Sequence, residues 1–266
     1  YLYFNQQGPH YLSEVHSKNV IINFNQIRDT LMTLTKFTVL FVMLCSLSYP
    51  WTAIAEQDRA AAKSVPIEAW GCSFNKGQDM NDLMSVVQEW NEWADETGST
   101  NYNAFVMTPL FHPDGMNSMT GWMGNWTDWK SMGESLDTLY SDGRRIMEKF
   151  GKVWDCSSRG MFNGQIVRQP AKKMTGDAVA TFYNCNLKEG KTGGDLLLAD
   201  KKWNKYLDSI SDVSAIVNLW PGPGNSEGFD FKVSVWVSSL STLGSDWEHW
   251  NNGGGWQTWI ETYGEI

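Results

Sequence analysis

The sequence predicts an α+β protein in which two tandem βαββαβ units, the ferredoxin-like pattern, follow one another. The first observation behind this fold class is an internal repeat. Residues 72–77 (CSFNKG) align without gaps with residues 185–190 (CNLKEG), and the same shift places Trp90 on Trp203. The second observation is that strand-like alternation and helix-like spacing follow each other in the same order in both copies.

The first unit spans residues 66–167 and contains every element of the pattern. Apolar alternation over Glu68–Phe74 predicts its first strand, with Trp70 and Cys72 on the face that packs against helices. The next stretch has its apolar residues at helical spacing. The elements expected after the first strand are a helix at 79–96, strands at 102–110 and 120–126, helical stretches at 128–140 and 143–150, and a last strand at 153–167.

The second unit spans residues 178–266 and follows a polar linker at residues 168–177. Its expected strands are at 178–187, 213–220 and 229–237, and its expected helices are at 195–209 and 242–250. Its last strand is missing, because Val153, at the start of that strand in the first unit, aligns with Ile266. We therefore expect the gene to continue past Ile266 with a strand that carries a cysteine. Without it, strand 178–187 should keep an unpaired edge beside Cys185.

The N-terminal region has the pattern of a secretory signal peptide at residues 32–55, if translation begins at Met32. Lys36 gives a positive start, an apolar run follows, and Ala53-Ile54-Ala55 forms a small-residue cleavage site. The apolar run is shorter than the ~20 residues that cross a bilayer.

Export follows from this interpretation. We expect cleavage after Ala55, so that the mature protein begins at Glu56, lies in the periplasm or outside the cell, and does not span a membrane. Residues 1–31 are then upstream sequence that is not native to the protein.

Composition excludes several classes of function. The formal net charge of −9 and the pI near 4.9 argue against nucleic acid as a partner, because a phosphate backbone is bound by clustered Lys and Arg. Scattered cysteines and two isolated histidines after residue 55, His112 and His249, do not have the short paired spacings of a zinc site. Motifs of serine hydrolases, P-loop proteins and zincins are missing. The sequence therefore predicts no metal, no cofactor and no catalytic set.

The stretch Gly124–Met132 (GNWTDWKSM) has a strand that ends in Trp and runs into a helix start with an acidic residue. It resembles the third strand and second helix of the dimeric α/β-barrel superfamily, which includes antibiotic monooxygenase-like, EthD-like and NIPSNAP-like domains. The resemblance implies two ferredoxin-like units, over residues 68–167 and 178–266, whose sheets form one barrel. It also implies binding or metal-free oxidation of small aromatic molecules inside that barrel. The histidine common in the corresponding helix of such domains is absent after Trp126.

Fifteen tryptophans give the protein ample aromatic surface for planar, sugar or cationic ligands. Trp90, Trp93 and Trp203 lie on apolar helix faces and are expected in the core. The candidates for a ligand-binding face lie on strands instead, and polar residues there either orient a ligand or face solvent. These candidates are Ser73, Asn125, Trp126, Asn184, Ser234 and Trp236.

Two cysteines are expected to be neighbours. In a ferredoxin-like sheet the first strand lies between the third and the fourth, so Cys72 and Cys156 belong to adjacent strands. An oxidising compartment then allows a disulfide between them.

The sequence favours an exported small-molecule-binding protein with an aromatic-lined barrel and a small aromatic or apolar ligand. One alternative is a cofactor-independent enzyme of the barrel group, such as a monooxygenase or an isomerase. A structural or self-associating role is the other alternative. Whether the protein is an enzyme is left open by the residues themselves.

Overall fold

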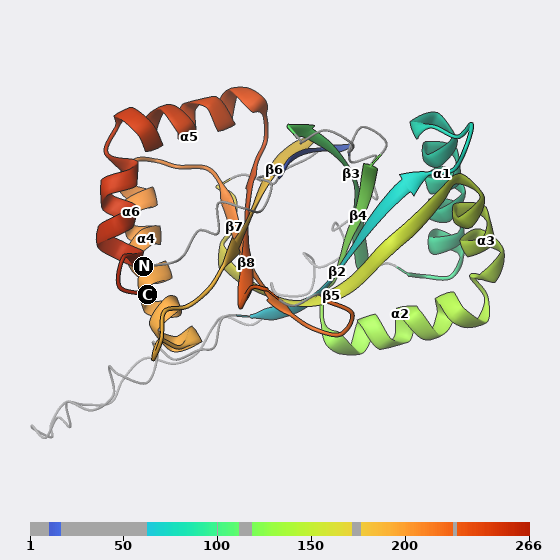
Figure 1. Ribbon diagram of the computed structural model, residues 1–266. Helices are drawn as coiled ribbons and strands as arrows, with labels where there is room; N and C mark the ends of the chain where they lie inside the picture. Colours follow the sequence, from blue (N-terminus) through green and yellow to red (C-terminus); the bar gives the residue numbers. More distant parts are fainter. Residues whose placement is uncertain (1–10, 17–62, 100, 112–118, 172–176, 226–227) are drawn as a thin grey trace, which may run out of the picture. The chain divides into compact units, whose positions relative to one another are not determined.

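Eight antiparallel strands close into one barrel in the computed structural model, and helices lie outside it (Figure 1). Around the barrel the strands follow the order β1-β3-β4-β2-β5-β7-β8-β6. The structure describes residues 11–16, 63–99, 101–111, 119–171, 177–225 and 228–266, and all of them belong to one compact unit. The expected α+β class with a ferredoxin-like barrel is confirmed by this strand order. The expected signal peptide at residues 32–55 lies outside the described residues.

The first half of the barrel has its strands in the order β3-β4-β2-β5. The first strand therefore lies between the third and the fourth, as the βαββαβ pattern predicts. Its elements are β2 (Ser64–Phe74), α1 (Met80–Glu96), β3 (Tyr102–Phe111), β4 (Met119–Trp126), α2 (Trp129–Ser141), α3 (Arg144–Val153) and β5 (Trp154–Arg168).

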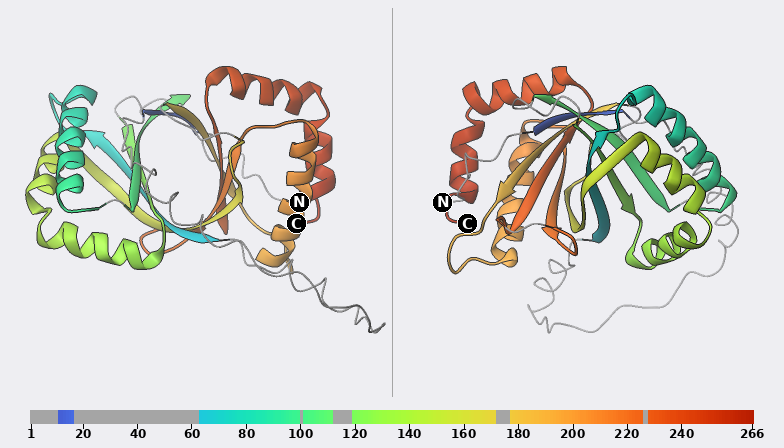
Figure 2. Two further views of the ribbon diagram at one scale, coloured as in Figure 1. Left: turned by 180° about the vertical axis from the view of Figure 1, so that it is seen from behind. Right: turned by 45° about the vertical axis from the view of Figure 1, so that its right-hand side comes forward.

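The second half continues the barrel with the strands in the order β7-β8-β6. Its elements are β6 (Ala178–Cys185), α4 (Gly193–Ser209), β7 (Ala215–Pro221), β8 (Phe231–Val237), α5 (Leu240–Asn252) and α6 (Gly255–Tyr263). Helices α1 to α3 cover the outside of the first half and α4 to α6 that of the second half (Figure 2).

One expectation about the second half is wrong. We expected strand 178–187 to keep an unpaired edge beside Cys185, but β1 (Tyr11–His16) pairs antiparallel with Ala178–Phe182 on that edge, and this pairing ends three residues before Cys185. The other edge of β1 pairs with β3. Strand β1 thus has the place in the second half that β5 has in the first. From the sequence we assigned no element to residues 11–16, because we placed residues 1–31 upstream of the signal peptide.

In both halves the first strand is joined to the first helix by the same kind of turn. Gly77 and Gly190 have positive φ angles of 81° and 78°, a region that costs glycine little and other residues more. Beyond the turns, Asp79 caps α1 and Thr192 caps α4, each in a reciprocal capping box. Local sequence therefore sets where both helices begin.

Strand alternation divides the apolar residues between two regions. One face of each strand fills part of the barrel interior, where Ile67, Met123, Leu219 and Trp236 belong to one buried cluster. The other face contacts the helices, and in the first half it forms a second buried cluster that includes Trp122. Side chains one position apart on a strand therefore belong to different cores.

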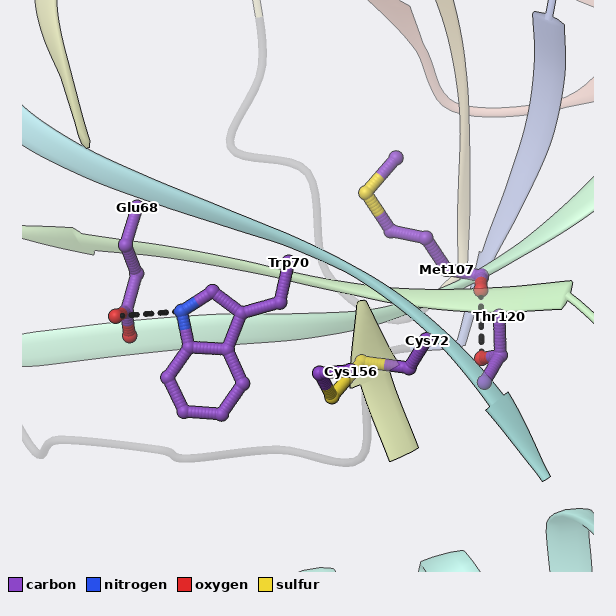
Figure 3. The surroundings of a disulfide bond; sticks show 6 residues. All are labelled: Glu68, Trp70, Cys72, Met107, Thr120 and Cys156. Atoms are coloured by element: carbon purple, nitrogen blue, oxygen red, sulfur yellow. Dashed lines mark hydrogen bonds between the residues drawn. A yellow bond between two sulfur atoms is a disulfide. The ribbon is translucent and has the colours of Figure 1, made fainter. Parts of the chain in front are cut away.

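A disulfide joins β2 to β5 in the first half (Figure 3). Cys72 and Cys156 oppose each other in the antiparallel pair, next to a register shift between Gly71 and Cys72, with their Cα atoms 3.9 Å apart. The bond closes a segment with a sequence separation of 84 residues. On the neighbouring strand pair, the Thr120 hydroxyl donates to the Met107 carbonyl over 2.9 Å (Figure 3).

Replacing both Cys72 and Cys156 with Ser should lower the free energy of unfolding by about 2–4 kcal/mol, because the unfolded chain regains the freedom that the closed loop removes. Urea titrations with and without dithiothreitol measure this. The reductant should bring the unsubstituted protein to the stability of the double variant and leave that variant unchanged. Equal stability of the two oxidised proteins would contradict the prediction.

Candidate functional site

The layer between sheet and helices is filled by aromatic side chains in the first half. The ring of Trp122 lies at the centre of that layer, 5.5 Å from Trp90, 5.8 Å from Phe150 and 6.3 Å from Trp154, measured between ring centroids. Only a cavity of about 50 Å³ is left beside them. Such a volume accepts a few water molecules and no larger ligand.

The same layer is hollow in the second half. Trp122 lies between Trp70 and Val106 on the neighbouring strands, whereas Val233 lies in the same position between Tyr183 and Asn218. The smaller Val233 side chain leaves the centre of the layer open. A cavity of about 530 Å³ lies here, between β6, β7, β8 and helices α4, α5 and α6.

Aromatic rings form much of the cavity wall. Trp203 comes from α4, Trp250 from α5, and Trp256, Trp259 and Tyr263 from α6. Their ring centroids are 5.4 to 6.4 Å apart from one ring to the next. Three helices therefore present their rings to one space.

A buried carboxylate lies at the inner wall of the cavity. Asp200 on α4 is 4% exposed, and it accepts hydrogen bonds from the Tyr263 hydroxyl over 2.9 Å and from the Asn218 amide over 2.8 Å. Burial raises the pKa of Asp200 to about 6, although both hydrogen bonds act in the opposite direction. Its carboxyl group consequently changes charge only a little below neutral pH.

A second polar group of side chains lies nearer the surface. Asp246 on α5 is half-buried, and this burial, with the nearby charge of Asp212, raises the pKa of Asp246 to about 6. Asp212 contacts Arg168, with 3.7 Å between the guanidinium Nε and the carboxylate. On the same side, the Tyr206 hydroxyl and the His249 ring share a hydrogen bond.

The cavity opens to solvent between its helices. Three apolar lining side chains are also exposed: Ile210 after α4 at 37%, Trp247 on α5 at 44% and Trp256 on α6 at 41%. Large apolar side chains at an opening are typical of ligand-binding clefts.

The first half buries a carboxylate of its own, Glu68 on β2. It accepts hydrogen bonds from the Tyr102 hydroxyl and from the Trp70 indole, the latter over 3.0 Å (Figure 3). Burial raises the pKa of Glu68 in spite of these donors and the charge of Arg159, whose guanidinium lies 4.3 Å from the Trp70 ring centroid. Glu68 borders the small cavity and is not among the residues that line the large one.

The residues proposed from the sequence as a ligand face lie apart from the large cavity. Trp236 is buried in the barrel interior between Phe105 and Phe182, and Ser234, also buried, donates to the Val217 carbonyl over 3.2 Å. Ser73, Asn125 and Asn184 share this side of the sheet, with Ser73 and Asn184 exposed and Asn125 half-buried.

Trp126 does not share that side. It points to the helix layer of the first half, where its ring lies 4.6 Å from the Tyr102 ring and is 2% exposed. Neighbouring residues of a strand face opposite ways, so Asn125 and Trp126 do not form one face.

Sequence reasoning missed Val233 and Asp200, the two residues that most distinguish the second layer from the first. The repeat alignment contains the signal, because it pairs Trp122 with Val233 and Val87 with Asp200. In the second unit a small side chain replaces a tryptophan in the core, and a carboxylate replaces a valine there. This combination predicts a cavity with a polar group in its wall.

Within the described segments, no three His, Cys, Asp or Glu side chains come close enough together to hold a metal ion. None of the described helices is both long enough and apolar enough to cross a membrane.

Neither a family model nor a curated protein matches the sequence. Among solved structures, a candidate monooxygenase from Fusobacterium nucleatum matches with a TM-score of 0.45 at 10% identity, over 75% of this chain and 88% of that one. A heme-binding protein from Thermus thermophilus matches with a TM-score of 0.42 at 10% identity, over 72% and 87%. An anthrone oxidase-like protein matches with a TM-score of 0.42 at 9% identity, over 71% and 79%.

The chain has the ferredoxin-like α/β-barrel fold. Its own strand order carries this assignment, since the likeness to the three solved structures is low. The ligands and reactions named for those proteins are theirs and are not assigned to this chain.

The raised pKa of Asp200 predicts a pH dependence of stability. The folded protein holds this proton more tightly than the unfolded chain, whose Asp titrates near pH ~3.9. The contribution of Asp200 to the free energy of unfolding should therefore rise as pH falls from about 7 to about 4, and Asp200→Asn should lower the free energy of unfolding at pH 4, relative to that at pH 7, by on the order of 2 kcal/mol. Urea titrations across this pH range measure it, with Asp137→Asn on the exposed face of α2 as the control. An unchanged profile for Asp200→Asn would contradict the assignment.

Proposed function

We propose that the protein binds a small organic molecule in the cavity between α4, α5, α6 and the sheet of the second half. The observation that carries this proposal is the difference between the two layers: about 530 Å³ in the second half against about 50 Å³ in the first. The larger value falls within the range of ligand pockets, roughly 300–1,000 Å³.

The composition of the wall supports the same conclusion. Ligand pockets are mostly apolar and aromatic, with a few polar groups that fix the orientation of the ligand. Here tryptophans supply the apolar surface, while Asp200, Asn218 and Asp246 supply polar groups from three different elements. In the first half the same arrangement of sheet and helices packs with little space between them. The fold itself therefore does not require the large cavity of the second half.

An enzyme is the second candidate, and one observation favours it. A carboxyl group with a pKa near 6 at the wall of a cavity, as at Asp200, is suited to proton transfer near neutral pH. Turnover of a bound compound, lost in Asp200→Asn with binding retained, distinguishes catalysis from binding alone.

A larger side chain that fills the cavity should weaken the binding of a small organic ligand. In Val233→Trp the ring takes the position of Trp122 in the first half, so the affinity for prodan, a neutral naphthalene dye, should fall at least about tenfold, equivalent to roughly 1.4 kcal/mol. Dye fluorescence measures the affinity, and circular dichroism verifies the fold. Leu198→Trp is the matched control, because Leu198 is 67% exposed on α4 and does not line the cavity.

Ser214→Tyr is a second filling variant. Ser214 also lines the cavity, and it lies immediately before β7. In the first half, Tyr102 lies at the corresponding place, the start of β3, so a Tyr ring at residue 214 is expected to enter the cavity. Prodan binding equal to that of the unsubstituted protein in a folded Val233→Trp or Ser214→Tyr variant would overturn the proposed site.

Export is part of the proposal. The signal-like pattern of residues 32–55 supports it, and so does the Cys72–Cys156 disulfide, a bond typical of oxidising compartments. Cleavage after Ala55 would remove β1 and leave the facing edges of β3 and β6 unpaired.

N-terminal sequencing of the protein from the periplasm or the medium should read Glu56 as its first residue, because cleavage follows the small residues Ala53 and Ala55. Cytoplasmic protein from cells blocked in secretion is the control and should keep the uncleaved start. Mature protein that retains Tyr11–His16 would contradict cleavage at this site.

A further inference from the structure

Carboxylates outnumber basic side chains in the described wall of the large cavity, where His249 is the one basic residue. Its described lining includes three carboxylates, Asp200, Asp212 and Asp246, and neither Lys nor Arg. A wall of this composition gives the interior a negative potential, which low-dielectric surroundings strengthen. Anionic ligands are therefore disfavoured.

The three carboxylates differ in their partners. Asp212 is paired with Arg168, which also contacts Asp208 over 2.7 Å. Asp200 accepts only from the uncharged donors Tyr263 and Asn218. Among the described residues, Asp246 has no cationic partner within ion-pair distance. Two carboxylates thus face the cavity without a Lys or Arg counterpart in the described part of its wall.

Aromatic faces accompany these charges. Trp250 lies one turn along the same helix from Asp246, with its ring centroid 5.4 Å from that of Trp256 and 6.0 Å from that of Trp259. Trp203, on the same helix as Asp200, lies 6.1 Å from Tyr263. Indole faces attract cations, most strongly where water is excluded.

We infer that the ligand of this cavity is an organic cation, an amine or quaternary ammonium group on an apolar body. This inference rests on the proposed function. Weakly hydrated ammonium groups enter an aromatic site more readily than inorganic cations, and the apolar body covers the remaining wall. Pairing with a ligand cation also offsets the cost of keeping Asp200 buried and charged.

The test compares two molecules of the same shape. Benzyltrimethylammonium carries a permanent charge, and neopentylbenzene is its neutral counterpart with carbon in place of nitrogen. Both are titrated as competitors of prodan at about pH 7.5, above the pKa of Asp200 and Asp246, so that both carboxyl groups are charged. Neither ligand has a proton that titrates. We expect the cation to bind at least about tenfold more tightly than the neutral compound.

Charge-neutral variants locate the effect. Asp200→Asn and Asp246→Asn should each weaken benzyltrimethylammonium binding about tenfold and leave neopentylbenzene unchanged. Asp137→Asn, on α2 of the first half, is the control. Asp246 is half-exposed, so its variant keeps the test valid if Asp200→Asn fails to fold.

The outcomes separate the two proposals. If prodan binds and the neutral compound competes as well as the cation, the cavity is a binding site and the inference of a cationic ligand is overturned. If both Asp variants bind the cation with unchanged affinity, the inference is overturned as well. If prodan and neopentylbenzene fail to bind up to their solubility limits and benzyltrimethylammonium, followed by intrinsic tryptophan fluorescence, fails to bind up to about 10 mM, the proposed function falls and the inference with it.

Discussion

Edge-to-edge pairing of the antiparallel strands is the constraint on which the rest of the structure depends, and in the uncleaved chain β1 completes the ring. Each strand needs partners for its backbone N–H and C=O groups on both edges, and β1 supplies them between β3 and β6. Once the ring of strands is closed, alternation sends every second side chain inward and the others to the helices. Two separate helix layers result, one on each half, and their side chains are free to differ.

The two layers show how one residue position controls the volume of a site. Trp122 fills the first layer by contact with rings from α1, α3 and the start of β5. Val233 occupies the corresponding place in the second layer, and the rings of Trp203, Trp250 and Tyr263 border a cavity. From the sequence we expected the aromatic ligand-binding surface inside the barrel. In the structure, the aromatic-lined cavity lies on the other face of the sheet, against the helices.

Buried carboxylates follow the same division. The Glu68 carboxylate accepts hydrogen bonds from Tyr102 and Trp70, and the Arg159 charge lies nearby. Its partners therefore all come from the first half. Asp200 has two uncharged donors and borders open volume, which leaves its charge available to a ligand. Burial raises the pKa of both groups, but Asp200 lines the cavity of about 530 Å³ and Glu68 the one of about 50 Å³.

The sequence by itself determined the order of the elements, because alternation and helical spacing are local, and it determined where α1 and α4 begin, because Asp79 and Thr192 cap them. It also implied that Cys72 and Cys156 lie on adjacent strands. The tertiary structure alone decided that β1 closes the barrel, since strand pairing depends on edges left open by distant segments. It also decided how large the hollow in the second layer is, because a cavity is the volume that side chains from six elements leave unfilled.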